Sequence, residues 1–287
     1  MSLPEDLHIR EATVDDVSCI AAIRAEVGWA EHEWALHAVI GQRNARCVVV
    51  TDADDRLAGV GSGIAYPPLG FIGNMVVASA HRRRGVGTAV LDDVARWLRS
   101  VGCTRLELNA TDDGKHLYAR HGFASRGRST VVRVARSTPV GSDPALRTRP
   151  ANESELDRLR SYDRPRFGGD RGPVLARLLA DPSCRTVTAE RDGSIVGYVV
   201  ARLDEPRLGP LVADDPAVAS TLLGCAFQAL PTSDELRLNL PPGNAVGASW
   251  LESLGVPIDA WDGRMARGPD VPRRDETIYQ MTVGPLG

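Results

Sequence analysis

The stretch that decides the fold is MVVASAHRRRGVGTAVLDDVARWLRSVG, residues 75–102. It opens with the end of a β-rich run (74–77), passes through three arginines and two glycines, and ends in a segment with helical periodicity. The apolar positions of that segment recur every three or four residues: Val86, Val90, Val94, Trp97 and Val101. We predict a strand, a glycine-containing turn and an amphipathic helix that Gly102 terminates.

The glycine-containing turn does not match the common nucleotide-binding loops. A dinucleotide-binding fingerprint requires G-x-G-x-x-G, and Val90 stands at its third glycine. A P-loop requires a different spacing and a lysine, and both are missing here. The pattern that remains is R-x-x-G-x-G, formed by Arg82, Gly85 and Gly87. A second glycine-rich run, GVGSG at 59–63, falls in the second strand of a predicted hairpin and indicates a bulge or a close backbone approach.

A strand that leads through such a turn into a helix is suited to binding an anion. The first N–H groups of a helix have no intrahelical partner, and the macrodipole places about half a positive charge at that end. Glycines at 85 and 87 leave room for a phosphate to approach the backbone, and neighbouring arginines add charge. The turn is therefore predicted to bind a pyrophosphate.

The same stretch, continued through LYARHGF at 117–123, resembles the GNAT superfamily of acyl-CoA-dependent N-acyltransferases. The family signature [Q/R]-x-x-G-x-[G/A] follows a strand, and an L-Y-x-x-x-G-F segment lies some thirty residues later. Both are present at the expected separation, and the resemblance covers residues 7 to about 135. It implies a mixed central β-sheet flanked by helices, with acetyl-CoA as the co-substrate and no metal.

The resemblance implies roles for particular residues. The turn and first helical residues would bind the coenzyme A pyrophosphate: Arg82, Arg83, Arg84, Gly85, Val86, Gly87 and Thr88. Met75, Val76 and Val77 would pair with the pantetheine arm and polarise the thioester carbonyl, and Asn109 is also implied in cofactor binding. Tyr118 matches the tyrosine that protonates the departing thiolate, a role suited to a phenol with a pKa near ~10.

The base that accepts the proton of the amine is left open. No carboxylate lies in residues 70–78, where some members of the family have one. Trp29, His32 and Glu33, in GWAEHEWALH (28–37), match the loop that lines the acceptor site. A water chain to bulk solvent is the expected proton route, with His32 or Glu33 as the alternative. Asp112, Lys115 and His116 depart from the residues usual before the tyrosine, so the cofactor contacts of that helix are also open.

The second half of the chain repeats the order of the first. Residues 9–24 correspond to 148–163, the hairpin 46–66 to 185–203, the strand 74–79 to 210–215, 105–110 to 237–242, and 117–123 to 250–256. We predict an α/β (α+β) protein with two GNAT-like domains: 1–137 as the catalytic domain, 138–147 as a linker and 148–287 as a degenerate domain that is structural or shapes the acceptor site.

The second half lacks the residues that define the predicted site. Asp214, Asp215, Pro216 and Ala217 stand in place of the arginines and glycines, and Leu251 stands in place of Tyr118. Carboxylates repel phosphate, and no glycine makes room for it. The second domain is therefore expected to bind no acyl-CoA.

Charge and composition restrict the partners. The net charge is −3, which argues against binding nucleic acid, and no apolar run approaches a membrane span. The N-terminus does not have the pattern of a secretion signal, and the five cysteines are scattered without C-x-x-C pairs, so a cytoplasmic protein without a zinc site is expected. A small-molecule or peptide amine would be the acceptor, and the chain would act as a monomer or homodimer.

The leading hypothesis is an acetyl-CoA-dependent N-acetyltransferase that moves an acetyl group to a primary amine by direct attack. One alternative is a non-catalytic acyl-CoA-binding sensor or regulatory protein. A second is a transferase of aminoacyl groups from tRNA, against which the pyrophosphate-binding turn and the absence of a basic face argue. The identity of the amine is open.

Overall fold

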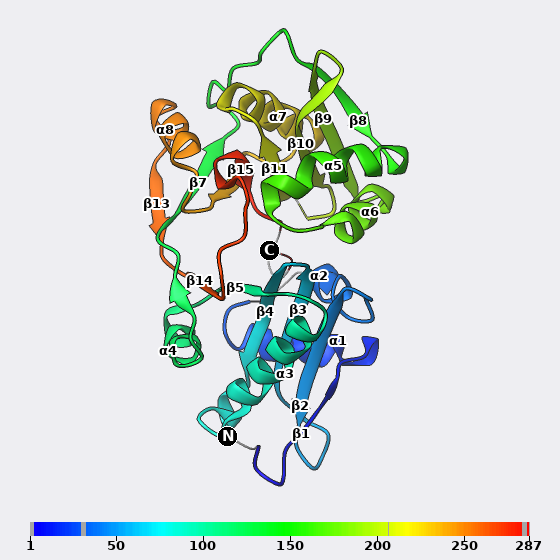
Figure 1. Ribbon diagram of the computed structural model, residues 1–287, viewed down its shortest axis with the longest axis vertical. Coiled ribbons are helices and arrows are strands. Elements are labelled where there is room, and N and C mark those ends of the chain that lie inside the picture. Colours follow the sequence, from blue (N-terminus) through cyan, green and yellow to red (C-terminus); the bar gives the residue numbers. More distant parts are fainter. Residues whose placement is uncertain (1–2, 30–32, 206, 283–285, 287) are drawn as a thin grey trace. The chain divides into compact units, whose positions relative to one another are not determined.

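The computed structural model describes residues 3–29, 33–205, 207–282 and 286, and the chain divides into two compact units. Unit 1 comprises 1–125, 265–271 and 284–287, and unit 2 comprises 126–264 and 272–283. Each unit combines β-sheet with helices, which confirms the predicted fold class (Figure 1). Within the described ranges, no helix is long and apolar enough to cross a membrane.

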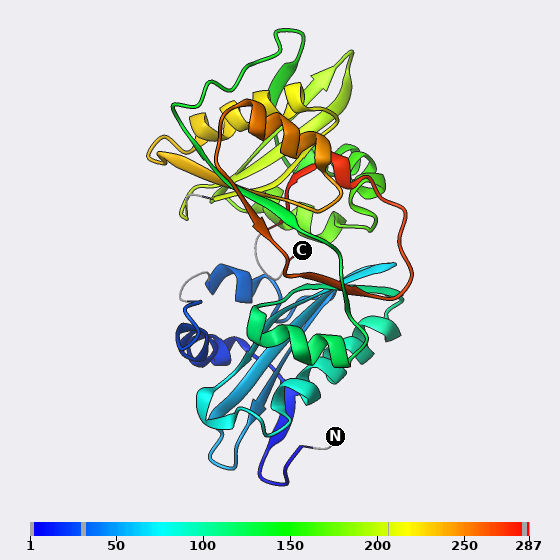
Figure 2. The ribbon, with the colours of Figure 1, turned by 90° about the vertical axis from the view of Figure 1, so that its left-hand side faces the viewer.

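Unit 1 is built on a seven-stranded sheet of order β1-β2-β3-β4-β5-β14-β6, in which β4 and β5 are parallel. Its strands are β1 (His8–Glu11), β2 (Ala45–Thr51), β3 (Leu57–Tyr66), β4 (Leu69–Val77), β5 (Arg105–Asn109), β14 (Arg264–Arg267) and β6 (Ala124–Ser125). Its helices are α1 (Val17–Ala25), α2 (Glu33–His37), α3 (Val86–Ser100) and α4 (Asp112–Arg120), with short 3-10 turns at Val14–Asp16 and Ser79–His81. Figure 2 shows α3 and the α1–α2 pair on opposite faces of this sheet.

The glycine run in β3 lets α3 approach the sheet closely. A Cβ on Gly59 would lie 2.6 Å from Val86 Cγ1, and one on Gly63 would lie 2.7 Å from Val94 Cγ1. Gly59, Gly61 and Gly63 lie on one face of the strand, and the valines that face them recur every fourth residue on one face of the helix. Each glycine therefore lies opposite one valine. This confirms the predicted helix and the predicted close approach. Val101 is the exception, since it follows the last helical residue and is 40% exposed.

Unit 2 contains a five-stranded sheet of order β15-β11-β10-β9-β8 and a three-stranded sheet of order β12-β7-β13. The strands are β7 (Ser129–Ala135), β8 (Arg147–Ala151), β9 (Cys184–Arg191), β10 (Ser194–Arg202), β11 (Arg207–Ala213), β12 (Glu235–Leu240), β13 (Ile258–Trp261) and β15 (Ile278–Gln280). The helices are α5 (Leu156–Phe167), α6 (Gly172–Ala180), α7 (Pro216–Ala229) and α8 (Ala245–Ser253), with 3-10 turns at Glu153–Glu155 and Asp275–Thr277. The order from β8 to α8 repeats that of unit 1, whereas β15 was not predicted.

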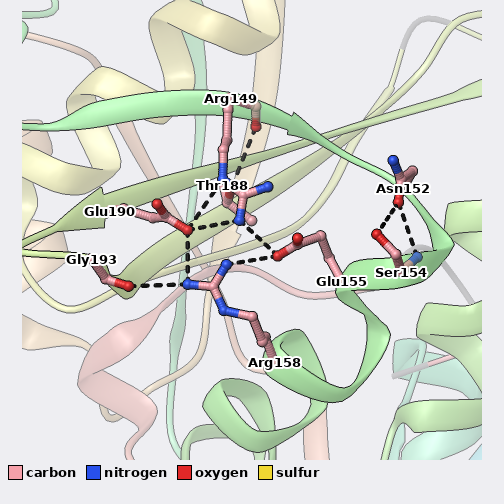
Figure 3. A network of polar contacts seen from close by, with 8 residues as sticks. All are labelled: Arg149, Asn152, Ser154, Glu155, Arg158, Thr188, Glu190 and Gly193. Carbon is pink, nitrogen blue, oxygen red and sulfur yellow. Dashed lines mark hydrogen bonds and ion pairs between the residues drawn. The ribbon is translucent and has the colours of Figure 1, made fainter.

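An ion-pair network holds the edge strand β8 of unit 2 to its neighbours (Figure 3). Arg149 on β8 contacts Glu155 at 2.7 Å and Glu190 at 2.8 Å, and Arg158 of α5 contacts the same carboxylates at 2.8 and 2.9 Å. The arginines, Arg149 first, hold the pKa of both carboxyl groups below the usual range. The network therefore stabilises the fold at neutral pH, and the contribution is lost as the carboxylates become protonated in acid.

The sequence predicts a division into 1–137 and 148–287, but in the structure each half of the chain contributes one strand to a sheet of the other unit. Strand β14, from the second half of the chain, lies between β5 and β6 of unit 1. Strand β7, from the first half, lies between β12 and β13 of unit 2. In unit 1, Arg105 of β5 holds the segment after β14 by donating to the Gly268 carbonyl (2.8 Å) and pairing with Asp270 (3.0 Å).

The exchange predicts that a fragment of residues 1–137 will not fold stably alone. It would lack β14, and its β7 would expose Val132 and Val134, which are 2% and 0% exposed in unit 2. Full exposure of a buried valine costs about 1.5–3 kcal/mol, and an open β5 edge invites aggregation. We expect the fragment to be insoluble, and to become soluble on co-expression with 138–287. A 1–137 fragment that melts cooperatively as a monomer would contradict this prediction.

Candidate active site

The end of β4 no longer pairs with β5, although it still pairs with β3. The pairs of β4 with β5 run from Leu69–Arg105 to Ile72–Leu108 and stop there. Opposite β3 the register shifts between Val60 and Ser62, and Asn74 adopts a left-handed conformation with φ of 55°. Residues 75–77 therefore extend beyond the β4–β5 pairs, which leaves their edge facing away from β3 available to an extended ligand.

A buried pair of polar side chains accompanies this bulge. Asn74 Nδ2 donates to Ser62 Oγ at 3.1 Å, and Ser62 Oγ donates to the Gly73 carbonyl at 3.2 Å. Both side chains are buried, with Asn74 6% and Ser62 0% exposed. Asparagine tolerates positive φ better than other residues with a side chain, so it fits this position both by conformation and by its amide.

If the chain uses the acyl-CoA that its sequence resemblance implies, the Asn74→Ala variant is expected to raise the KM for that co-substrate about 5- to 100-fold. The reason is that left-handed strain of roughly 1–3 kcal/mol favours a straightened strand. Steady-state kinetics would measure the change. Asn74→Gly, which keeps the backbone freedom, should recover most of the loss. The matched control is Asp55→Ala, which places alanine at φ of 59° in an exposed turn and should leave the KM unchanged. An unchanged KM in Asn74→Ala would show that the bulge does not position the ligand.

The start of α3 presents backbone donors that no side chain caps. Gly85 occupies the N-cap with φ of 86°, and Arg83 before it has φ of 62°. The Ala89 N–H donates to the Gly85 carbonyl, so the amides of Val86, Gly87 and Thr88 precede the first intrahelical bond. A Cβ on Gly87 would lie 3.3 Å from Leu117 of α4 and 3.6 Å from Val77 of β4. The three elements therefore converge at this helix end.

The three arginines before α3 differ in their surroundings. Arg82 and Arg83 are exposed, whereas Arg84 donates from Nη2 to both carboxylate oxygens of Asp6 at 2.9 and 2.7 Å. The Arg84 guanidinium lowers the pKa of Asp6. Glu26, at the end of α1, accepts the Ser79 N–H at 3.0 Å, and this bond lowers the pKa of Glu26. Asp6 and Glu26 thus hold the loop between β4 and α3 from two sides.

Tyr118 lies on α4 and is buried in the core that α3 shares with the sheet. Its side chain is 6% exposed and makes an edge contact with the Phe123 ring at a centroid distance of 6.0 Å. Burial raises the pKa of Tyr118 to about 12, and its hydroxyl makes no hydrogen bond to any described residue. A phenol in this setting stays protonated at neutral pH and retains a proton to donate.

The remaining predicted residues lie on other segments of unit 1 or outside the described chain. Asn109 is the exposed last residue of β5. Trp29 follows α1 and is half-buried, and its backbone N–H donates to the Arg24 carbonyl at 2.9 Å. Glu33 is the first residue of α2, and His32 lies outside the described residues. Lys115 pairs with Asp112 at 2.8 Å on the exposed side of α4.

Sequence reasoning missed four residues that organise this region: Asp6, Glu26, Ser62 and Asn74. An asparagine within a β-rich run, opposite GVGSG, was a signal that could have indicated the bulge. The two acidic residues are distant in sequence from the loop they contact and gave no signal. Among residues 3–29, 33–205, 207–282 and 286, no group of three or more His, Cys, Asp or Glu side chains could hold a metal ion.

Two family models match the chain, one in each half. The acetyltransferase (GNAT) family model matches residues 14–123, and an acetyltransferase (GNAT) domain model matches residues 159–280. The chain is 26% identical over 155 residues to an uncharacterized N-acetyltransferase, YitH, of Bacillus subtilis (strain 168), a match that covers 53% of this chain and spans about half, 54%, of that relative.

Solved structures match nearly the whole chain. A candidate acetyltransferase of Pyrococcus horikoshii superposes with a TM-score of 0.81 and 22% identity over 100% of this chain and 98% of its own. A tandem GNAT protein from the clavulanic acid biosynthesis pathway superposes with a TM-score of 0.64 and 15% identity. That match covers 92% of this chain and 99% of the other. These likenesses show the fold, and the two family models show the family. The chain belongs to the GNAT superfamily of acetyltransferases and carries two GNAT domains in tandem.

Proposed function

We propose that unit 1 transfers an acetyl group from acetyl-CoA to a primary amine. The observation that carries the proposal is the juxtaposition of an open strand end, an uncapped helix N-terminus and a buried phenol. The end of β4, the start of α3 and the α4 helix of Tyr118 supply them. A Cβ at Gly87 would lie within 3.6 Å of a side chain from each of the other two elements. The family match supports acyl transfer, and the geometry of β4, α3 and α4 supports the proposal that it takes place in unit 1.

The residues present suit a pyrophosphate at the start of α3. The free amides of Val86, Gly87 and Thr88 would donate to its oxygens, and the helix dipole adds to this attraction. Arg82 and Arg83 are exposed beside them and would pair with phosphate, whereas Arg84 is already bound to Asp6. The backbone of Met75–Val77 would bind the extended pantetheine arm.

Acetyl-CoA supplies a thioester carbon that an amine can attack directly. A backbone N–H at the end of β4 would donate to the carbonyl oxygen as charge develops there. The C–N bond forms as the C–S bond breaks, and Tyr118 gives its proton to the leaving sulfur. The amine loses its own proton through water to solvent, and solvent reprotonates Tyr118. The acceptor site is proposed to be lined by Trp29, His32 and Glu33, as the resemblance to the family implies.

An assay of thiol release with a panel of primary amines tests the proposal. We expect acetyl-CoA binding together with turnover on at least one class of amine, and N-acetylated product by mass spectrometry. Tight acetyl-CoA binding without turnover on small amines, peptides or protein amines would instead support the non-catalytic acyl-CoA-binding alternative. Failure to bind acetyl-CoA at all would contradict both.

A further inference from the structure

We propose that unit 2 is closed by its own chain, with strand β15 and the Asp215 carboxylate occupying the places that a ligand takes in unit 1. Each chain therefore has one acyl-CoA site, in unit 1. The identity of that ligand rests on the proposed function, but the closure itself is argued from the comparison of the two units.

Strand β15 covers the edge of β11 that corresponds to the open end of β4. The repeat aligns 74–79 with 210–215, so Leu211 and Val212 correspond to Met75 and Val76. In unit 2 these two residues pair with Gln280 and Ile278 of the antiparallel β15. The backbone groups that unit 1 offers at this point are thus already used in unit 2, because an edge can pair with one strand only.

Side chains fix β15 on its other side as well. Gln280 Oε1 accepts the Asn239 N–H of β12 at 2.6 Å, and Asn244 Nδ2, at the start of α8, donates to the Ile278 carbonyl at 2.8 Å. Asn244 also accepts the Gly247 N–H, which caps α8. Strand β15 is thus the edge strand beside β11, and its Gln280 side chain binds the β12 backbone, whereas β4 and β5 of unit 1 pair directly.

The burial of β15 agrees with a permanent place in the fold. Ile278 and Tyr279 are 1% and 0% exposed, and the Tyr279 ring packs edge-on against Trp250 at 5.7 Å between centroids. Thr282 beyond the strand accepts a hydrogen bond from the buried Arg171 at 2.8 Å. Removing this strand would expose the core of unit 2, so its displacement by a soluble ligand is unfavourable.

The second place is the start of α7, which corresponds to the start of α3. Asp215 is its N-cap and accepts the Val218 N–H at 2.9 Å, and Pro216 removes one donor altogether. Asp214 is held by Arg166 at 2.6 Å and by the Tyr162 hydroxyl at 3.0 Å. The helix end that is uncapped in unit 1 thus carries its own anion in unit 2. Leu251, at the position of Tyr118, is fully buried and has no proton to give.

Calorimetric titration of the full chain with acetyl-CoA tests the closure by its stoichiometry. We expect one site per wild-type chain and no measurable site in Gly85→Glu, which disables the start of α3. Two sites in the wild-type chain, of which one persists in Gly85→Glu, would overturn the closure and leave the proposed function standing.

Hydrogen exchange read by mass spectrometry tests the closure without relying on the ligand. Amides of 278–280 should exchange slowly in the free protein and be unchanged by saturating acetyl-CoA, while amides of 75–88 should become slower. A wild-type chain that binds no acetyl-CoA would contradict the proposed function alone. Fast exchange at 278–280, or a change there on adding acetyl-CoA, would contradict the closure alone.

Discussion

Replacing Tyr118 with phenylalanine is expected to lower kcat about 10²- to 10⁴-fold, the usual contribution of a general acid. The KM for acetyl-CoA should change little, because the ring and its edge contact with Phe123 are retained. The hydroxyl is the only group removed, so the loss reports on proton donation to the departing thiolate rather than on packing.

The pH dependence sharpens this expectation. Burial raises the pKa of Tyr118 to about 12, so the acid stays protonated through the range in which the enzyme can be assayed. The activity of the wild-type chain should therefore not fall through this group until the pH approaches 12. The raised pKa also means that its contribution to folding stability is complete below about pH 10 and is lost between pH 10 and 12.

Tyr279→Phe is the matched control. Its hydroxyl is buried in unit 2 and makes no hydrogen bond to the described residues, so its removal should leave kcat and the melting temperature near the wild-type values. A Tyr118→Phe variant with a kcat within a few-fold of wild type would exclude Tyr118 as the acid, provided that the Tyr279→Phe control is unchanged.

Replacing Gly85 with glutamate is expected to weaken acetyl-CoA binding by at least about 10-fold and, if two hydrogen bonds are lost, by about 100-fold or more. Hydrogen bonds to a charged group contribute roughly 1.5–3 kcal/mol each, and the variant would lose one or two of them at the start of α3. The added carboxylate also repels phosphate. Gly85 has φ of 86°, so the substitution strains the helix start as well. Calorimetry or retention on a coenzyme A resin would measure the loss.

Gly41→Glu separates this effect from general backbone strain. Gly41 also lies in unit 1 with φ of 70°, and a side chain there would meet no atom within 4 Å. The two variants therefore share the same charge and a similar left-handed penalty. Gly41→Glu should bind acetyl-CoA as the wild type does. Equal affinities of the two variants would contradict the assignment of the pyrophosphate to the start of α3.

The local elements and the family could be predicted from the sequence because they depend on short-range patterns. The helix from Val86 follows from its period of three to four residues, and its start follows from Gly85 and Gly87. The hairpins follow from alternating apolar runs with a turn between them. A comparison of the first half of the sequence with the second is enough to find the repeat. The same comparison finds the acidic residues at 214 and 215.

The exchanged strands and the contacts around the site could not be predicted in this way. The residues 129–135 and 264–267 have the same β-forming character whichever sheet they join, and the choice depends on partners more than 100 residues away. Asp6, Glu26 and Asn74 gain their roles from neighbours distant in sequence, or from a bulge that only the pairing of β3 with β4 creates.

The sequence alone therefore determined that the chain is a tandem GNAT protein, with the R-x-x-G-x-G pattern proposed to bind pyrophosphate and the candidate acid, Tyr118, in its first half. The tertiary structure decided which edges remain open: β4 ends beyond its partner in unit 1, whereas β15 pairs with β11 in unit 2. The physical reason is that a strand's hydrogen-bonding groups are the same in every sequence. Whether they are available to a ligand depends on which distant segment folds against them.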